Sequence, residues 1–344
     1  MMVFEKFSGC TSLLKSISAI WLILFSACSL VTPTPDVTGT PPPTINPSPI
    51  PSSTLAHPSA IPIPTGTLPK SPTAKPPTST PGPQPLRFAV IGDYGSGDRM
   101  EEDVAALVRS WQPDLVITTG DNNYPDGTAE TIDENIGQFY HQFIFPYLGS
   151  YGEGAQENRF FPSLGNHDWH AAAAQPYLDY FNLPGNERYY DFTWGAVHFF
   201  ALDSDSREPD GVGRTSMQAA WLKEQLENSS SPWNIVYFHH APYSSGLHGN
   251  VDWMQWPFAE WGADAVFSGH DHTYERILRQ GIVYFVNGLG GMSRYTFMGV
   301  IDGSQVRYNQ EYGAMLVEAS EEALRFQFIN RLNEIVDTFE LTSP

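Results

Sequence analysis

The segment Gly269-His270-Asp271-His272 carries the residue types best suited to binding a metal ion. Its histidines are two residues apart, and side chains with that spacing in extended backbone project to the same side. The apolar run Ala265-Val266-Phe267-Ser268 before it has the length and composition of a buried strand that ends at Gly269. Such a pair at a strand end can present two nitrogen ligands to one cation. By itself it could equally be two polar histidines in a loop.

Four other polar clusters follow apolar runs upstream of this segment. Taken singly, each has a simpler interpretation: a turn, a helix cap, a loop or a hydrogen-bonded pair of core histidines. Taken together, five strand ends carry residue types that bind borderline metals, and separate coincidences do not explain so regular a placement. The clusters are Asp93; Asp121 with Tyr124; Asn166 with His167; His239 with His240; and His270 with His272.

Cysteine and charge restrict the kinds of ligand and partner. The only cysteines, Cys10 and Cys28, lie in the first 28 of 344 residues, so metal ligands farther along must be His, Asp, Glu, Asn or Tyr. Beyond residue 86 the chain holds 14 Lys and Arg against 36 Asp and Glu, a formal charge of −22. This charge argues against nucleic acid as a structural partner, since nucleic-acid binding depends on basic side chains. An anionic substrate would need bound cations to reverse the local sign.

The segments between the clusters predict the elements that position them. Strands are expected at residues 86–91, 115–119, 159–164, 233–238 and 265–268, and helices at 99–111, 130–145, 171–181, 217–226 and 253–261. Strands that alternate with helices and end in polar residues are typical of an α/β sheet, where ligand sites lie at the carboxyl ends of the strands. We expect the helix at 217–226 to bury Met217, Ala220, Trp221 and Leu226.

The remaining strands are expected to be antiparallel. Residues 189–192 and 196–202 predict a hairpin that turns at Trp194-Gly195. Alternating segments follow at 282–286, 314–318, 324–328 and 335–339, and the last two are expected to pair as a hairpin.

Residues 1–28 have the features of an export signal. Lys6 and Lys15 precede an apolar stretch, residues 17–27, that is too short to span a membrane. Residues 24–28 resemble the bacterial lipobox, in which Cys28 would receive a lipid. Phe25 is bulkier than that motif usually has, so cleavage by an ordinary signal peptidase stays open.

Residues 29–85 consist largely of Pro, Thr and Ser. Such a segment cannot bury enough apolar surface to offset the entropy of ordering, so we predict a disordered, semi-rigid stalk. The folded domain is expected at residues 86–344, held outside the cytoplasm as a cell-surface lipoprotein or secreted.

The order and spacing of the clusters resemble the metallophosphoesterase superfamily and, within it, the purple acid phosphatases. The matching blocks are Asp93-x-Gly95, Gly120-Asp121-x-x-Tyr124, Gly165-Asn166-His167-Asp168, Val236-x-x-His239 and Gly269-His270-x-His272. The resemblance extends from about Phe88 to Arg276. It implies the calcineurin-like fold, a four-layer α/β/β/α sandwich with helices outside, two sheets inside and a two-metal site.

The resemblance also implies which residues bind each metal. Asp93, Asp121, Tyr124 and His272 would bind the first ion, and Asn166, His239, His270 and the shared Asp121 the second. A phenol titrates near pH 10 in water, so a phenolate from Tyr124 at neutral pH requires a strongly Lewis-acidic ion such as Fe(III). The second ion would be Fe(II), Zn or Mn.

The activity implied is hydrolysis of a small phosphomonoester by a metal-bound hydroxide. His167 would contact the phosphate or protonate the leaving oxygen, and Asp168 would either orient His167 or only shape the turn. His248, nine residues after His239, would face the substrate as in the mammalian-type enzymes. The role of His240 is left open. Tyr274-Glu275-Arg276 resembles the plant-type enzymes and is expected to support the ligands from behind.

Two alternatives remain open. The same metals could serve a phosphodiesterase or nucleotidase, because leaving-group recognition resides in variable loops. The domain could also be a non-catalytic module that binds phosphate or metal at the cell surface. The physiological ester, the second metal, the pH optimum and the oligomeric state are not indicated by the sequence.

Overall fold

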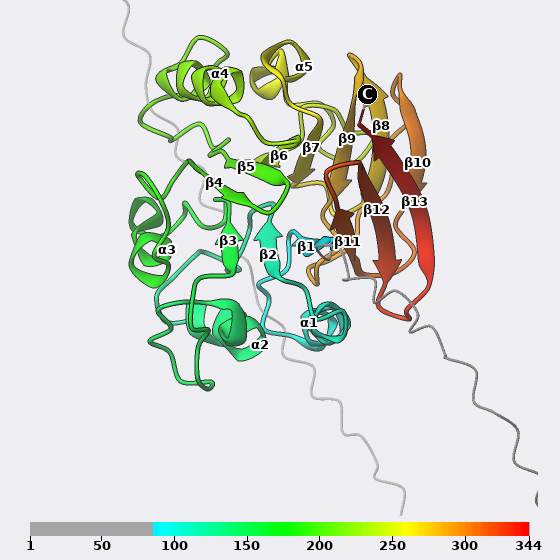
Figure 1. Cartoon of the computed structure of the whole chain (residues 1–344). Coiled ribbons are helices and arrows are strands. Elements are labelled where there is room, and N and C mark those ends of the chain that lie inside the picture. Colours follow the sequence, from blue (N-terminus) through cyan, green and yellow to red (C-terminus); the bar gives the residue numbers. More distant parts are fainter. Residues whose placement is uncertain (1–84, 344) are drawn as a thin grey trace, which may run out of the picture. The chain divides into compact units, whose positions relative to one another are not determined.

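Two mixed β-sheets are formed by the apolar runs in the computed structural model, which describes residues 85–343 (Figure 1). From edge to edge, the six-stranded sheet contains β13 (Ile335–Thr342), β12 (Ala323–Asn330), β11 (Gly313–Ala319), β1 (Leu86–Ile91), β2 (Leu115–Thr118) and β3 (Phe160–Pro162). Strands β1, β2 and β3 pair in parallel, whereas the pairs β1–β11, β11–β12 and β12–β13 are antiparallel. The predicted C-terminal hairpin is therefore confirmed.

The seven-stranded sheet contains β10 (Ser304–Tyr308), β8 (Tyr274–Arg279), β9 (Ile282–Asn287), β7 (Ala265–Gly269), β6 (Trp233–His240), β5 (Val197–Ala201) and β4 (Tyr190–Trp194). Its central strands β5, β6, β7 and β9 pair in parallel. The prediction that all later strands are antiparallel is wrong for β9, which pairs in parallel with β7 and antiparallel with β8. The predicted β4–β5 hairpin is confirmed, and Gly195 at its turn has φ 59°.

Helices cover the outer faces of both sheets. In Figure 1, α1 (Arg99–Ser110) and α2 (Gln138–Tyr140) lie below the six-stranded sheet, and α4 (Met217–Asn228) and α5 (Phe258–Trp261) lie above the seven-stranded one. Strand β6 shows how the layers form, because successive side chains point to opposite faces. Ile235 and Tyr237 join the cluster between the sheets, while Val236 and Phe238 join the cluster under α4 and α5. The expected four-layer α/β/β/α sandwich is therefore present.

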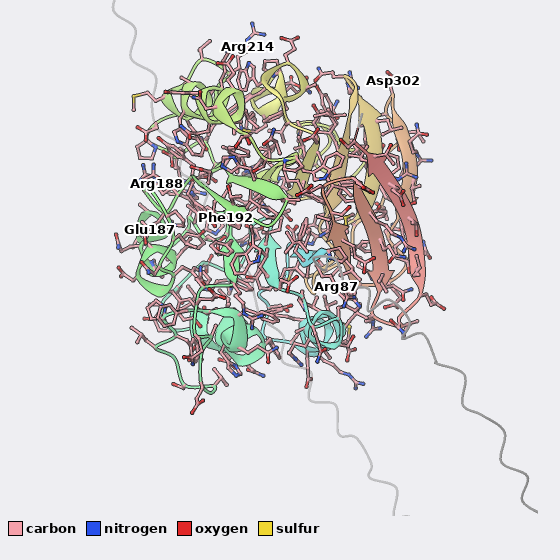
Figure 2. All side chains as sticks on the ribbon, in the orientation of Figure 1. Arg87, Glu187, Arg188, Phe192, Arg214 and Asp302 are labelled. Atoms are coloured by element: carbon pink, nitrogen blue, oxygen red, sulfur yellow. The ribbon has the colours of Figure 1, made fainter. Side chains whose placement is uncertain are left out.

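Aromatic stacking joins the two sheets. Phe192 of β4, labelled in Figure 2, has its ring centroid 3.8 Å from that of Phe161 in β3 and 4.8 Å from that of Phe199 in β5. Beside them, α3 (Gln175–Tyr180) is held by the Tyr177 hydroxyl, which donates to the carbonyl of Pro162 (2.7 Å).

Three predicted helices are shorter or broken. Residues 130–145 form a π-helix (Asp133–Gly137), α2 and a 3₁₀ turn (His141–Phe143), and residues 171–181 contain a 3₁₀ turn (Ala172–Ala174) before α3. Ala172, Ala173 and Ala174 all have positive φ, which ends regular helix there. Residues 253–261 likewise divide into a 3₁₀ turn (Asp252–Met254) and α5, on either side of Pro257.

The predicted buried side of α4 is partly wrong. Its buried residues are Gln218, Ala219, Leu222 and Leu226, whereas Met217 is 65% exposed. Gln218 turns inward because its side chain accepts from the Asp203 N–H (2.8 Å) and donates to the Asp203 carbonyl (2.9 Å). Hydrophobic periodicity does not reveal a polar residue held in this way.

The predicted signal at residues 1–28, the lipid attachment at Cys28 and the stalk predicted at residues 29–85, apart from Pro85, lie outside the described residues. Among residues 85–343, none of the helices has the length and apolar character needed to cross a bilayer.

Candidate metal centre

The carboxyl ends of β1, β2, β3, β6 and β7, with the loops that follow them, bring the predicted ligands to one place. Asp93, Asp121 and His270 have φ values of 54°, 53° and 69°, a left-handed conformation that costs about 1–3 kcal/mol when a residue is held there and that concentrates at functional sites. The glycines of the motifs permit close approach. A Cβ on Gly165 would lie 2.2 Å from Asp121 Oδ1, and one on Gly269 would lie 2.5 Å from Asp93 Oδ2.

The first group of ligand atoms surrounds the Tyr124 hydroxyl. This oxygen lies 2.9 Å from Asp121 Oδ2, 3.4 Å from Asp93 Oδ1 and 3.3 Å from His272 Nε2. His272 Nε2 is in turn 3.4 Å from Asp93 Oδ1. All four residues are buried.

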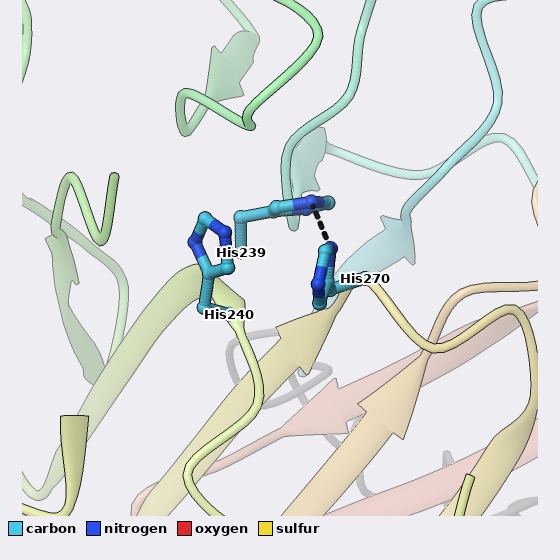
Figure 3. Close-up of side chains that lie close together, drawn as sticks. All are labelled: His239, His240 and His270. Carbon is cyan, nitrogen blue, oxygen red and sulfur yellow. Dashed lines mark hydrogen bonds between the residues drawn. The ribbon is translucent and has the colours of Figure 1, made fainter. Parts of the chain in front are cut away.

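The second group surrounds His239 Nε2. That nitrogen lies 3.3 Å from Asp121 Oδ2, 3.0 Å from Asn166 Oδ1 and 3.1 Å from His270 Nδ1 (Figure 3). Asp121 Oδ2 thus belongs to both groups. The structure brings all seven predicted ligands together, and Asp121 is the one they share.

The tautomers of two histidines suit metal binding. His239 Nδ1 donates to the carbonyl of Thr119 (2.9 Å), and His272 Nδ1 donates to the carbonyl of Ser293 (2.6 Å), since a carbonyl oxygen can only accept. Each ring then presents the Nε2 lone pair to its group, an arrangement typical of metal-bound histidine. The spacings of 2.9–3.4 Å match neighbouring ligands that lie about 2.0–2.2 Å from one cation. The residues present therefore fit a pair of cations.

Electrostatics favours positive charge at the same place. Burial lowers the pKa of His239, but the charge of Asp121 and its hydrogen bond raise it to about 10. Burial, Asp121 and Asp93 together raise the pKa of Tyr124 well above its ordinary value. Buried carboxylates thus attract whatever cation is available, and a phenolate here requires one of high charge.

Comparison with known proteins identifies the family. The model of the calcineurin-like phosphoesterase family matches residues 86–274. The chain belongs to this family. Purple acid phosphatase 15 of Arabidopsis thaliana is 28% identical over 253 residues, which cover 62% of this chain and 47% of the relative. A purple acid phosphatase of Glycine max is 26% identical over 229 residues, covering 60% of this chain and 47% of the relative. The chain spans about half the length of these two relatives.

Two solved structures share the fold. GAP50, described as the anchor in the inner membrane complex of Plasmodium, superposes with a TM-score of 0.59 at 21% identity, covering 76% of this chain and 90% of that one. Purple acid phosphatase PPD1 from yellow lupin seeds has a TM-score of 0.57 at 18% identity and covers 75% of this chain and 53% of that one.

His167 lies beside the first group of ligands. Its backbone N–H donates to Asp121 Oδ1 (2.9 Å), and its Nδ1 donates to the carbonyl of Pro125 (2.5 Å). Its ring lies 4.4 Å from the Tyr124 ring, and its Nε2 is 4.0 Å from Asp121 Oδ2. The hydrogen bond to Pro125 thus fixes the ring of His167, with Nε2 facing the ligands.

Asp168 makes the contacts of a residue that shapes the turn. Its buried carboxylate accepts from the Gly165 N–H (2.9 Å), the Asn122 N–H (3.1 Å) and Asn122 Nδ2 (2.8 Å). The Tyr94 hydroxyl donates to Asn122 Oδ1 (3.0 Å). These bonds connect the loops after β1, β2 and β3. Among residues 85–343, every hydrogen bond of the Asp168 carboxylate goes to Asn122 or Gly165, so His167 is oriented by Pro125 instead.

His248 and Tyr295 lie over the imidazoles of ligands. The exposed ring of His248 stacks on His270 with centroids 4.1 Å apart, and Tyr295 stacks on His272 with centroids 4.0 Å apart. The backbone N–H of His248 donates to Asp271 Oδ1 (2.8 Å). Its imidazole is therefore exposed to solvent beside the ligands.

Behind the ligands, Tyr274 and Arg276 both donate to Asp337 Oδ2, at 2.8 Å and 2.7 Å. Glu275 accepts from the N–H of Ser245 (2.7 Å), in the loop that carries His248. These contacts agree with the supporting role expected of this segment.

Sequence reasoning missed the loop between β5 and α4. Arg207 in this loop donates to the backbone carbonyls of Asn166 (3.0 Å) and Trp169 (3.1 Å), and its guanidinium also contacts both oxygens of Asp205 (2.7 and 2.8 Å). The sequence does carry a signal for this loop. The polar run Asp203-Ser204-Asp205 directly follows the apolar strand, just as the polar ligand clusters follow the other strands.

Proposed function

We propose that the chain is a dinuclear metal-dependent phosphomonoesterase of the purple acid phosphatase type. The observation that carries this proposal is the pair of ligand groups that meet at Asp121 Oδ2, which lies 2.9 Å from the Tyr124 hydroxyl and 3.3 Å from His239 Nε2. A carboxylate oxygen surrounded by a phenol and an imidazole suits a bridge between two cations.

The metals proposed are Fe(III) in the Tyr124 group and Fe(II), Zn or Mn in the His239 group. The raised pKa of Tyr124, caused by burial and two carboxylates, supports a trivalent ion as the partner of a phenolate. A relative named Fe(3+)-Zn(2+) purple acid phosphatase 12 of Arabidopsis thaliana, 25% identical over 236 residues, supports the same pairing. Those residues cover 62% of this chain and 48% of the relative.

When bound, the cations would supply the water-derived nucleophile and the positive charge that offsets the phosphate. The side chains of the protein would bind the phosphate and protonate the leaving oxygen. The imidazole of His248 would hold a phosphate oxygen at the opening of the site. His167 would carry a proton at Nε2 and deliver it to the leaving oxygen, while Pro125 keeps its ring in position.

A non-catalytic surface module is the second candidate. It is favoured by the fold shared with GAP50, described as an anchor, of which the chain covers 90%. The retention of His167 and His248 around the ligands supports the enzyme instead, because a binding module needs metals and not a proton donor. A surface location through a lipid on Cys28, or secretion, follows from the features of residues 1–28 and belongs to the same proposal.

Hydrolysis assays on the purified chain test the function. We expect the protein loaded with iron and zinc to hydrolyse p-nitrophenyl phosphate with a higher kcat/KM than bis(p-nitrophenyl) phosphate. A preference for the bis-ester would favour the phosphodiesterase. A protein that retains two metals but hydrolyses neither ester at any pH would favour the binding module.

A further inference from the structure

His240 lies beside the second group of ligands, and the mechanism proposed above does not use it. Its ring centroid is 4.5 Å from that of His270 and 5.0 Å from that of His239 (Figure 3). The residue is 8% exposed. One of its ring nitrogens lies within 4.8 Å of ligand atoms on both neighbouring histidines.

Ser204 determines which nitrogen of His240 carries the proton. The Ser204 hydroxyl oxygen accepts the backbone N–H of His240 (2.8 Å) and lies 2.9 Å from His240 Nδ1. Within residues 85–343, Nδ1 is the only acceptor in reach of the buried Ser204 hydroxyl hydrogen, and leaving that hydrogen unbonded inside the protein would be unfavourable. Nδ1 therefore accepts, and Nε2 carries a hydrogen on the side of the ring that faces His239 and His270 (Figure 3).

The aromatic ring of Trp253 lies next to the imidazole of His240. Its ring centroid is 5.9 Å from that of His240, and its Nε1 donates to the carbonyl of Ser204 (3.1 Å). The side chain is nevertheless 45% exposed. Because its only polar atom is already bonded, Trp253 can offer a ligand nothing but the face and edge of an aromatic ring.

We propose that His240 and Trp253 form a leaving-group subsite for phosphate esters whose alcohol carries a planar aromatic ring. His240 Nε2–H would donate to an oxygen of the ester, and Trp253 would stack on the ring. The proposal rests on the proposed function for the position of the phosphate. The aromatic ring could come from an aryl ester or from the base of a nucleotide, and the experiments include both.

Binding to the metal-loaded protein tests the subsite without turnover. We expect phenylphosphonate to bind about tenfold more tightly than methylphosphonate by calorimetry, a factor in the range of one stacked aromatic pair. Trp253→Leu should remove this difference, and Trp253→Phe should restore part of it. Trp261→Leu is the matched control, because Trp261 packs against the cluster under α4 and α5, and it should leave the difference intact.

Kinetic measurements then distinguish the two classes of ester, aryl esters and nucleotides. Trp253→Leu should lower kcat/KM for phenyl phosphate or for adenosine 5′-monophosphate about tenfold relative to glycerol phosphate, and the ester that shows the larger loss is the preferred class. His240→Phe, which retains a ring but removes both nitrogens, should raise KM for the same ester while the metal content stays at the wild-type level.

Three results would overturn the proposal. The first is equal affinity for phenylphosphonate and methylphosphonate in the wild type. The second is an unchanged substrate ratio in Trp253→Leu, and the third is loss of metal in His240→Phe, which would make His240 a ligand. Absence of all hydrolysis together with selective phenylphosphonate binding would instead reject the proposed function and retain the subsite.

Discussion

Tyr124 is the residue whose chemistry most restricts the metal. Its hydroxyl is buried among Asp121, Asp93 and His272, and burial together with the two carboxylates raises its pKa well above the ordinary value. A phenol in such surroundings ionises only when a strongly charged cation replaces its proton. If Fe(III) binds here as proposed, any visible absorption band that arises from phenolate-to-iron charge transfer should depend on this single oxygen.

We expect Tyr124→Phe to lose the visible absorption band of the iron-loaded protein. The other three side chains of its group remain, so metal content should fall less than colour does. Visible spectra recorded beside elemental analysis measure both effects. A band of undiminished intensity would place the phenolate on another tyrosine.

Asp121→Asn should affect both metals, because Asp121 Oδ2 contacts both ligand groups and the change removes its charge. We expect metal content to fall from about two ions per chain to fewer than one, since both cations would lose the negative charge that they share. Asp126→Asn is the control, because Asp126 lies near the same loop with its side chain 65% exposed. Wild-type metal content in Asp121→Asn would contradict the bridging assignment.

At the scale of elements, the loop between β5 and α4 holds the loop after β3 through Arg207. Arg207→Ala removes two hydrogen bonds to the backbone carbonyls of Asn166 and Trp169 and frees the loop that carries one ligand. We expect the second metal to bind about 10–100-fold more weakly, as is typical when residues behind a ligand are lost. Titration of the metal-free protein with zinc measures this. Arg214→Ala, on an exposed position before α4 (Figure 2), should bind zinc like the wild type; equal weakening in both variants would refute the role of Arg207.

The first turn of α1 contains a buried carboxylate. Glu101 accepts from the N–H groups of Ser96 (2.9 Å) and Gly97 (2.8 Å), but burial raises its pKa well above its ordinary value of 4.5. Because the pKa is raised in the folded state, the stability associated with Glu101 is fully present below pH 4.5 and is lost as pH rises through the folded pKa.

Glu101→Gln should therefore become progressively more stable than the wild type as pH rises above 4.5, since its amide oxygen can still accept from both N–H groups. Urea unfolding of the two proteins at several pH values gives the difference in free energy. A difference that does not change with pH would show that Glu101 does not titrate in this way.

The sequence predicted the central strands best and the irregular segments worst. Strands β1, β2, β6 and β7 lie in the middle of sheets, so continuous apolar runs mark them and the ligands at their ends. The sequence did not predict strands β8 and β10, because polar residues interrupt the apolar ones along them and because they lie near an edge of their sheet. The contact between Arg207 and Asn166, 41 residues apart, depends on how the loops pack and has no local pattern.

For the whole molecule, charge is the main constraint. The chain carries a formal charge of −20, and the two carboxylates among the ligands, Asp93 and Asp121, are buried. A phosphate ester would be repelled by this surface, so substrate binding and cation binding must occur at the same point. Hydrolysis of such an ester would therefore require two cations, one on either side of Asp121.

Anomalous diffraction from crystals of the metal-loaded protein tests that claim most directly. We expect two anomalous peaks, one among Asp93, Asp121, Tyr124 and His272 and the other among Asp121, Asn166, His239 and His270, separated by about 3.5–4 Å. A single peak, or peaks that leave Asp121 without a bound metal, would contradict the dinuclear centre.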